Sequence, residues 1–357
     1  MKIGIVTVHD SNNYGSFLQA YALQCVLQQM GHEVYFAVTR DKKFVKKIFV
    51  PALLQKKLFR HPFSLLRSHK NGRIKRKAFL NDQKCFEEIE KEDLSKMDLV
   101  ILGSDEIWNV QVKNFRNKIF YGSDLTNVLA YGVSVGRAGR EDFVKYPEII
   151  SCIRNIHCVL ARDNRTKEIV KEITGVSPDI VCDPTFLVDR SVFSRKDTVP
   201  VKKAAEEYVL IYSYGIGEEL EKKIKDFAEE NRLKIVSACF YYKWADYNIM
   251  CGPMDFCSII KGADCVITTT FHGTIFSVLN QKQFISIPAS IKTNDLLEQI
   301  GLAERIVGEK AGVDVIQGLL KQDIIDYIEV NKRISDMRSK SLQLLTKGID
   351  LTVMKND

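Results

Sequence analysis

The residues best placed to do chemistry lie in one stretch, TTTFHGTIFSVL at positions 268–279. The apolar run DCVIT just before it predicts a buried strand, and the residues after the threonines predict a helix that begins near His272. Thr268, Thr269 and Thr270 are candidate N-caps, and we expect Gly273 to leave the backbone open at the first helical turn. Helix N-termini attract anions, so the junction can bind one. Taken alone, however, His272 is more often a hydrogen-bonded structural residue.

Further charged side chains follow other predicted strands. Arg162 ends the run IHCVLAR, where a guanidinium can clamp a carboxylate or phosphate, although pairing with a local acid is the common alternative. Lys292 precedes a helix that we expect from Asn294. The strand LVILG is followed by Ser104, Asp105 and Glu106. The carboxylate of Asp105 has two interpretations: a base or orienting group, or a helix cap.

A polar loop, HDSNNYGS at positions 9–16, separates the first predicted strand from its helix. Open α/β sheets bind ligands at the carboxyl ends of their strands, and this loop lies at such an end. Asn12, Asn13 and Gly15 suit the positive φ angles of a tight turn, and Ser16 is a candidate cap. Asn13, Tyr14 and Gly15 are therefore candidate ligand contacts. An ordinary strand-to-helix turn is the alternative.

Strand and helix patterns alternate along the whole chain, which predicts an α/β protein with two Rossmann-like domains. We expect the first domain over residues 1–188, with a basic helical excursion at 40–77. A charged linker follows at 190–207. The second domain is expected over residues 189–322. The last segment, 323–357, predicts one long amphipathic helix that packs back on the domain junction.

Composition restricts the functional classes. The chain has 357 residues and is 45% hydrophobic, enough for two buried cores. No apolar run has the length of a membrane span, and the first residues do not resemble a signal peptide. Nine scattered cysteines are typical of reduced thiols, and their spacing matches no zinc site. We therefore expect a cytoplasmic protein without a structural metal or cofactor.

Positive charge is concentrated in the excursion at 40–77, which has fourteen Lys and Arg residues and one acid. Apolar residues recur between the charges at helical spacing, which predicts basic amphipathic helices. A solvated helical insert is one interpretation. Peripheral contact with an anionic membrane at the inner leaflet, or with an anionic substrate, is the other. Nucleic acid is not expected, because no recognised binding motif accompanies the charge.

Five motifs in order resemble the signature of the polysaccharide pyruvyl transferase family. They are NYGSFLQAYAL at 13–23, GSDEIWN at 103–109, ARD at 161–163, DPT at 183–185 and FHG at 271–273, with Lys292 after them. Glu106 departs from the family pattern, which leads us to expect Gln there. The resemblance covers nearly the whole chain.

The resemblance implies two Rossmann-like domains facing across a cleft, as in glycosyltransferase-B enzymes. It implies phosphoenolpyruvate as the donor and a pyruvate ketal formed on a sugar of a capsule or other exopolysaccharide, or on its lipid-linked precursor. By resemblance, Arg162, Lys292, Thr270 and Gly273 bind the donor, while His272 binds phosphate or acts as general acid. Asp105 is assigned by position to the sugar hydroxyl, with Asn13, Tyr14, Gly15, Ser104 and Trp108 on the acceptor side.

Two other functional classes fit the same fold. A nucleotide-sugar-dependent glycosyltransferase also uses helix ends to bind a diphosphate. A non-catalytic saccharide-binding protein would keep the fold without the chemistry. The cations and the acidic loop at predicted strand ends favour an enzyme, since a scaffold does not require them.

Overall fold

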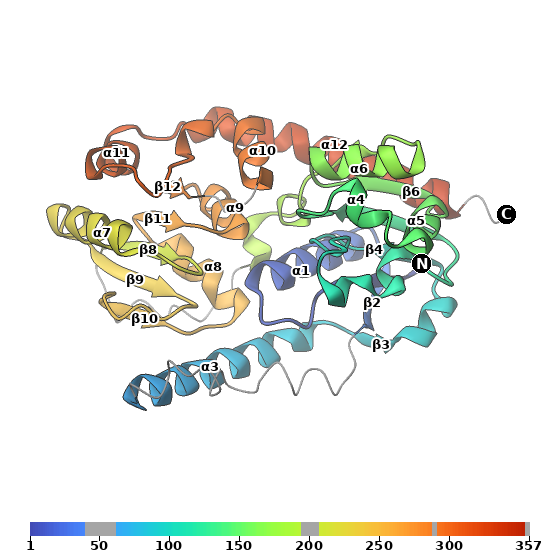
Figure 1. Cartoon of the computed structure of the whole chain (residues 1–357), viewed down its shortest axis with the longest axis horizontal. Helices are drawn as coiled ribbons and strands as arrows, with labels where there is room; N and C mark the ends of the chain where they lie inside the picture. Colours follow the sequence, from blue (N-terminus) through green and yellow to red (C-terminus); the bar gives the residue numbers. More distant parts are fainter. Residues whose placement is uncertain (40–61, 194–206, 288–290, 354–357) are drawn as a thin grey trace. The chain divides into compact units, whose positions relative to one another are not determined.

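Two parallel β-sheets, one in each of two compact units, organise the chain (Figure 1). The computed structural model describes residues 1–39, 62–193, 207–287 and 291–353. The first unit comprises residues 1–40, 83–192 and 334–357, and the second comprises residues 41–82 and 193–333. The prediction of an α/β protein with two Rossmann-like domains is confirmed.

The sheet of the first unit has seven parallel strands in the order β3-β2-β1-β4-β5-β6-β7. Their bounds are β1 Lys2–Val6, β2 Glu33–Val38, β3 Glu88–Glu90, β4 Leu99–Leu102, β5 Val128–Val133, β6 Cys158–Ala161 and β7 Asp179–Ile180. Strands β4 and β5 are buried at every residue, which explains their continuous apolar sequences. The main helices are α1 Tyr14–Gln29, α4 Arg140–Phe143, α5 Pro147–Arg154 and α6 Asn164–Thr174.

The sheet of the second unit has five parallel strands in the order β10-β9-β8-β11-β12. Their bounds are β8 Tyr208–Tyr212, β9 Lys234–Ala238, β10 Tyr247–Ile249, β11 Cys265–Thr268 and β12 Gln283–Ser286. The helices include α3 Pro62–Asp82, α7 Glu218–Glu230, α8 Pro253–Gly262, α9 Phe271–Leu279, α10 Ile291–Gln299 and α11 Val313–Gln317. A core of aliphatic residues from β8, β11 and α7 fills one side of this sheet, so α9 starts from a firmly packed strand.

The basic excursion at 40–77 was expected to belong to the first domain. Its described part, α3, belongs to the second unit and not to the first. The physical reason is packing against α8: the Asp82 Oδ2 atom accepts a hydrogen bond from the Met254 backbone N–H at 3.2 Å. Residues 40–61 lie outside the described part of the chain.

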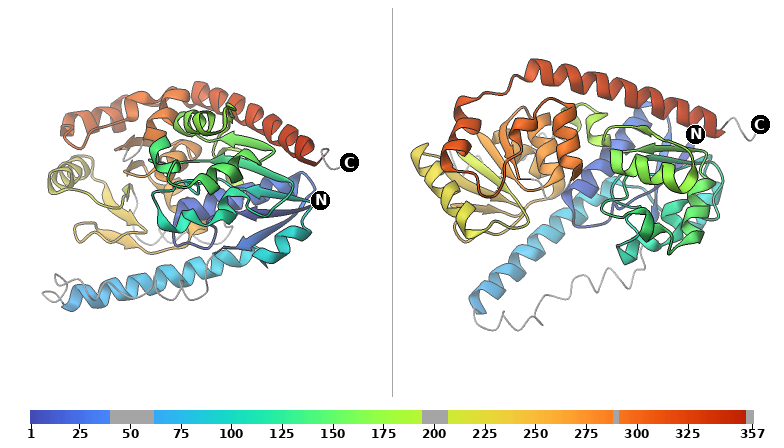
Figure 2. Two further views of the ribbon diagram at one scale, coloured as in Figure 1. Left: turned by 45° about the vertical axis from the view of Figure 1, so that its right-hand side comes forward. Right: turned by 45° about the horizontal axis from the view of Figure 1, so that its top comes forward.

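The last helix, α12 Tyr327–Val353, is continuous (Figure 2), as the sequence predicted. From Ile334 onward its residues belong to the first unit. There the Ser341 hydroxyl accepts a hydrogen bond from the Cys182 N–H at 2.9 Å, and Arg338 donates to the Phe186 carbonyl. Within the described ranges, no helix is both long enough and apolar enough to cross a membrane.

Candidate active site

The loop after β4 holds Asp105 in an unusual backbone conformation. Its φ angle is +90°, a region that L-residues rarely adopt and that costs about 1–3 kcal/mol. Backbone pairing with β5 maintains the conformation, since the Ser134 N–H donates to the Asp105 carbonyl at 3.0 Å. Asp105 therefore does not cap a helix, which was one of its two interpretations. Non-glycine residues under such strain are concentrated at functional sites.

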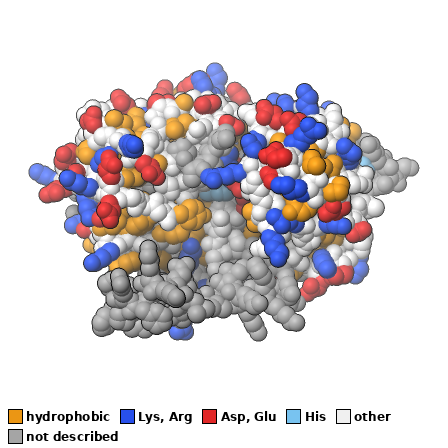
Figure 3. All heavy atoms as spheres, viewed as in Figure 1, with side chains coloured by type: hydrophobic (Ala, Val, Ile, Leu, Met, Phe, Trp, Pro, Cys, Tyr) orange, Lys and Arg blue, Asp and Glu red, His pale blue; other side chains and the backbone are white. Residues whose placement is uncertain are grey.

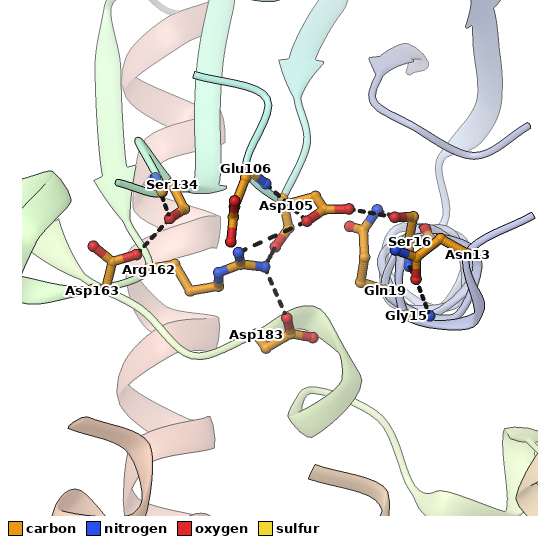
Figure 4. Close-up of polar contacts among 12 residues, drawn as sticks. Asn13, Gly15, Ser16, Gln19, Asp105, Glu106, Ser134, Arg162, Asp163 and Asp183 are labelled. Carbon is orange, nitrogen blue, oxygen red and sulfur yellow. Dashed lines mark hydrogen bonds and ion pairs between the residues drawn. The ribbon is translucent and has the colours of Figure 1, made fainter. Parts of the chain in front are cut away.

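The Asp105 carboxylate is held by neighbours from separate elements (Figure 4). Its Oδ1 atom accepts a hydrogen bond from the Glu106 N–H at 2.8 Å, and its Oδ2 atom accepts one from the Ser16 hydroxyl at 2.5 Å. The Arg162 Nη2 atom lies 4.0 Å from Oδ1. These contacts fix the orientation of a carboxylate whose side chain is still 16% exposed.

Arg162 lies at the end of β6 and is almost completely buried, with 2% of its side chain exposed. Its Nη1 atom donates to Asp183 Oδ2 at 3.2 Å and to the Ser104 hydroxyl at 3.2 Å. Burial lowers the pKa of Arg162, but the carboxylates of Asp183 and Asp105 outweigh burial, so the pKa is raised overall. Arg162 therefore pairs with local acids, which was the alternative to clamping a carboxylate or phosphate ligand.

The loop at positions 9–16 forms the start of α1 and not a tight turn with positive φ angles. Asn13 is the N-cap of α1, and its Oδ1 atom accepts hydrogen bonds from the N–H groups of Gly15 and Ser16. Ser16 is not the cap, because it lies inside the first turn and points its hydroxyl at Asp105. Asn12, Asn13 and Gly15 do not have the positive φ angles that we expected. Asp105, in the loop after β4, does have one.

Two residues predicted on the acceptor side are core residues. Trp108 is fully buried, and its Nε1–H donates to the Phe120 carbonyl at 2.8 Å. Tyr14 is 1% exposed. The Trp108 ring packs in the hydrophobic core of the first unit, and the Tyr14 side chain is almost completely buried. Ser104 is also buried, but its hydroxyl accepts a hydrogen bond from Arg162 and so helps to position that guanidinium. Asn13 is exposed.

In the second unit, hydroxyl groups build the junction between β11 and α9. Thr268 donates to the Tyr212 carbonyl at 2.7 Å. Thr270 is the N-cap of α9, as predicted, and its Oγ1 atom accepts from the Gly273 N–H at 2.9 Å. The expectation that Gly273 leaves the backbone open is wrong: a Cβ atom there would lie 2.1 Å from Thr268 Oγ1. Glycine is required for close packing of helix on strand.

The side chains of His272 and Lys292 both contact Phe271, the first residue of α9. The rings of Phe271 and His272 have centroids 5.3 Å apart in an edge arrangement. The Lys292 Nζ atom, on α10, lies 4.8 Å from the Phe271 ring centroid, within range of a cation–π interaction. All three residues are half-buried. An ammonium group and an imidazole thus each lie beside the Phe271 ring at the N-terminal end of a helix.

The predicted cations therefore fall into two groups. Arg162 belongs to the first unit, whereas His272 and Lys292 belong to the second. Arg162 is committed to internal acids, so the geometry does not support a direct grip on a donor. The nine cysteines are free thiols. Among residues that the structure describes, no group of three or more His, Cys, Asp or Glu side chains is placed to hold a metal.

A model of the polysaccharide pyruvyl transferase family matches residues 13–290, which include every motif described above. The chain belongs to this family. No curated protein sequence gives a significant match to the chain.

Solved structures with the same fold include enzymes that act on nucleotide sugars. UDP-GlcNAc 2-epimerase from Neisseria meningitidis, solved with UDP-GlcNAc, is 10% identical; the match covers 97% of this chain and 100% of that chain, with a TM-score of 0.55. UDP-N-acetylglucosamine 2-epimerase from Rickettsia bellii is 12% identical, with coverages of 98% and 96% and a TM-score of 0.52. UGT89C1 from Arabidopsis thaliana is 9% identical, with coverages of 99% and 98% and a TM-score of 0.51. At these identities the likeness establishes the glycosyltransferase-B-like fold alone.

Sequence reasoning overlooked several residues that support the site of this pyruvyl transferase family member. Asp183 was recognised only as part of a motif, but its Oδ1 atom also binds the Thr185 N–H and hydroxyl while Oδ2 pairs with Arg162. Ser16 was considered only as a cap. Phe271 was quoted without a role. Their signal was present as an acid, a hydroxyl and an aromatic ring at predicted strand ends.

Proposed function

We propose that the protein transfers the enolpyruvyl group of phosphoenolpyruvate to two hydroxyls of a sugar. The acceptor sugar belongs to a surface polysaccharide or its lipid-linked precursor, and the products are a pyruvate ketal and phosphate. Family membership supports the reaction class. The observation that carries the assignment of the donor is the contact of both His272 and Lys292 with Phe271 at the start of α9.

Phosphoenolpyruvate is small and carries both a carboxylate and a phosphate. Its binding site needs cations and helix-end donors around a compact volume. The start of α9 offers these features: Lys292 supplies an ammonium group, the helix supplies its dipole, and His272 supplies an imidazole that can donate or accept a proton. We assign donor phosphate to Lys292 and the N-terminal turn of α9. His272 is assigned to protonation of the donor or to its phosphate.

The acceptor hydroxyl is assigned to Asp105 in the first unit. The carboxylate is partly exposed and is oriented by Ser16 and by its own backbone, which is what a general base requires. Arg162 and Asp183 act as positioning residues, because they are buried behind Asp105. Thr270 and Gly273 shape the helix terminus on the donor side through their cap.

The chemistry then balances without a cofactor. A proton adds to the methylene carbon of the donor, and charge develops at C2 as an oxocarbenium ion. The first hydroxyl attacks C2 and loses its proton to the base; the C2–O bond to phosphate breaks; the second hydroxyl attacks C2 and loses its proton in turn. Of the two protons released, one replaces the proton placed on the methylene carbon and the other stays with phosphate.

One experiment separates this proposal from the two other functional classes. Purified protein is incubated with phosphoenolpyruvate and a panel of lipid-linked or nitrophenyl glycosides, and the products are examined by mass spectrometry. We expect the mass increment of a pyruvate ketal on at least one glycoside. In parallel, phosphoenolpyruvate should raise the melting temperature. Stabilisation by a nucleoside diphosphate with no ketal product would favour the glycosyltransferase, and stabilisation by glycosides alone would favour the binding protein.

A further inference from the structure

Helix α3 is attached to the second unit by one face only. Asp82 binds the Met254 N–H at the start of α8, and its Oδ2 atom would lie 2.4 Å from a Cβ atom at Gly252, so the two helices meet closely. Phe79 is fully buried. The Lys75 Nζ atom lies 4.9 Å from the Phe240 ring centroid, and burial lowers the pKa of Lys75. Since these residues are spaced four and three apart, they form one side of the helix.

The opposite side of α3, which we call the outer face, combines bases with exposed apolar side chains. Ile74 is 44% exposed and Leu80 is 53% exposed. The bases of the outer face are exposed too: Lys70, Arg73 and Lys77. Helical spacing places all five residues on the side away from Lys75, Phe79 and Asp82.

The charge of this segment is one-sided. Residues 70–82 contain five bases and one acid, Asp82, which is turned inward to α8. Elsewhere acids and bases are mixed, as they are on the face drawn in Figure 3. Among residues 70–82, the outer face of α3 therefore has bases but no acid to pair with them. Such a face repels cations and is complementary to a polyanion.

We propose that the outer face of α3 docks the protein on an anionic lipid surface. Clustered Lys and Arg are attracted to anionic headgroups, and Ile74 and Leu80 can enter the interface between headgroups and acyl chains. A nucleic acid or a soluble polysaccharide would use the charges but would leave both apolar side chains in water. Because Asp82 and Phe79 already hold the helix, docking orders little additional backbone. This binding does not depend on which reaction the protein catalyses.

The test is sedimentation with vesicles of phosphatidylcholine alone or with one third phosphatidylglycerol. We expect binding to the anionic vesicles only, and release by about 0.5 M salt, where the Debye length is about 4 Å. The triple variant Lys70→Gln, Arg73→Gln and Lys77→Gln should bind about 100-fold more weakly, since each cation near the surface contributes about fivefold. The charge-matched control, Lys113→Gln, Lys171→Gln and Lys340→Gln, removes exposed bases from other elements and should bind as the unaltered protein does.

A second variant distinguishes lipid from other polyanions. Ile74→Ser with Leu80→Ser keeps every charge and should weaken binding to anionic vesicles several-fold, without weakening binding to heparin. The proposal is overturned if this variant binds vesicles normally, if both triple variants lose binding equally, or if neutral and anionic vesicles bind alike. Ketal formation on a soluble glycoside should be unchanged in all these variants, so failure of docking and failure of the proposed reaction are separate results.

Discussion

The two strand-end junctions are built from different chemistry. In the first unit, β4 leads to Asp105, and the contacts there are ionic: Arg162 is buried between Asp183 and Asp105. In the second unit, β11 leads to α9, and the hydrogen bonds of Thr268, Thr270 and Gly273 join hydroxyl and backbone groups. One junction is held by buried charge and the other by neutral hydrogen bonds.

This difference indicates how strongly each junction can attract an anionic substrate. The Arg162 charge is surrounded by carboxylates, so the first junction offers no net positive field to a phosphate. At the second junction Lys292 and His272 are half-buried beside the first residue of α9, where the helix dipole favours an anion. We therefore assign the neutral sugar hydroxyl to the first junction and the anionic donor to the second. Each of the following substitutions tests that division.

His272→Ala should have the largest effect on turnover. Loss of a general acid typically lowers kcat by about 10²–10⁴-fold. The fold should persist, because the cap of α9 is formed by Thr270 and Gly273 and not by the histidine. The rate of phosphate release at saturating donor measures the effect. His157→Ala, at an exposed position of the first unit, is the control and should be fully active. Near-normal turnover in the His272 variant would remove the imidazole from the chemistry.

Arg162→Met should act on stability and not on donor affinity. The substitution leaves Asp183 buried without its guanidinium, and breaking a buried ion pair in this way costs about 3–5 kcal/mol. Urea unfolding followed by circular dichroism measures the loss. The double variant with Asp183→Asn should recover part of it, since an amide oxygen can still accept from Thr185 while the uncompensated charge is gone. An unchanged unfolding midpoint with weakened donor binding would return Arg162 to the donor-binding role that its position in the sequence suggested.

Lys292→Ala should show the reverse behaviour. A charge-assisted contact to phosphate contributes about 1.5–3 kcal/mol, so the apparent affinity for phosphoenolpyruvate should fall about 10- to 100-fold. The unfolding free energy should change little, because the lysine side chain is only half-buried. Steady-state kinetics with varied donor measure the change. Unaltered donor affinity would show that the donor lies away from the start of α10.

The sequence predicted the fold well because the relevant signals are local. Buried parallel strands such as β4 and β11 are continuous apolar runs, and α6 begins after an Asp163 N-cap and ends at Gly175, both local features of the sequence. The short edge strands β3 and β10 were not predicted, since EIE and YNI have neither length nor apolar continuity. The attachment of α3 to the second unit was also missed, because one long-range cap by Asp82 leaves no local signal.

The sequence predicted that the candidate site residues follow strands, but it did not predict their contacts. Ordered motifs located Asp105, Arg162 and His272 at strand ends, as the structure has them. Whether Arg162 faces a ligand or an internal acid depends on residues 21 positions away, which no local pattern reports. Trp108 was misplaced for a similar reason: its motif also holds Asp105 and Glu106, but its ring packs inward and its N–H donates to the Phe120 carbonyl.

The smallest effect is expected at the cap of the second junction. Thr270→Ala removes the oxygen that accepts from the Gly273 N–H, and loss of an N-cap costs about 1 kcal/mol. Thr270→Ser keeps that oxygen and should preserve stability. Because the cap also fixes the first turn of α9, which carries His272, the Ala variant should lose several-fold in turnover while the Ser variant does not. Thermal unfolding and turnover, measured on both variants, give the comparison. Equal losses in the two would mean that the methyl group packs and the hydroxyl does not matter, so the neutral hydrogen bonds would no longer explain the second junction.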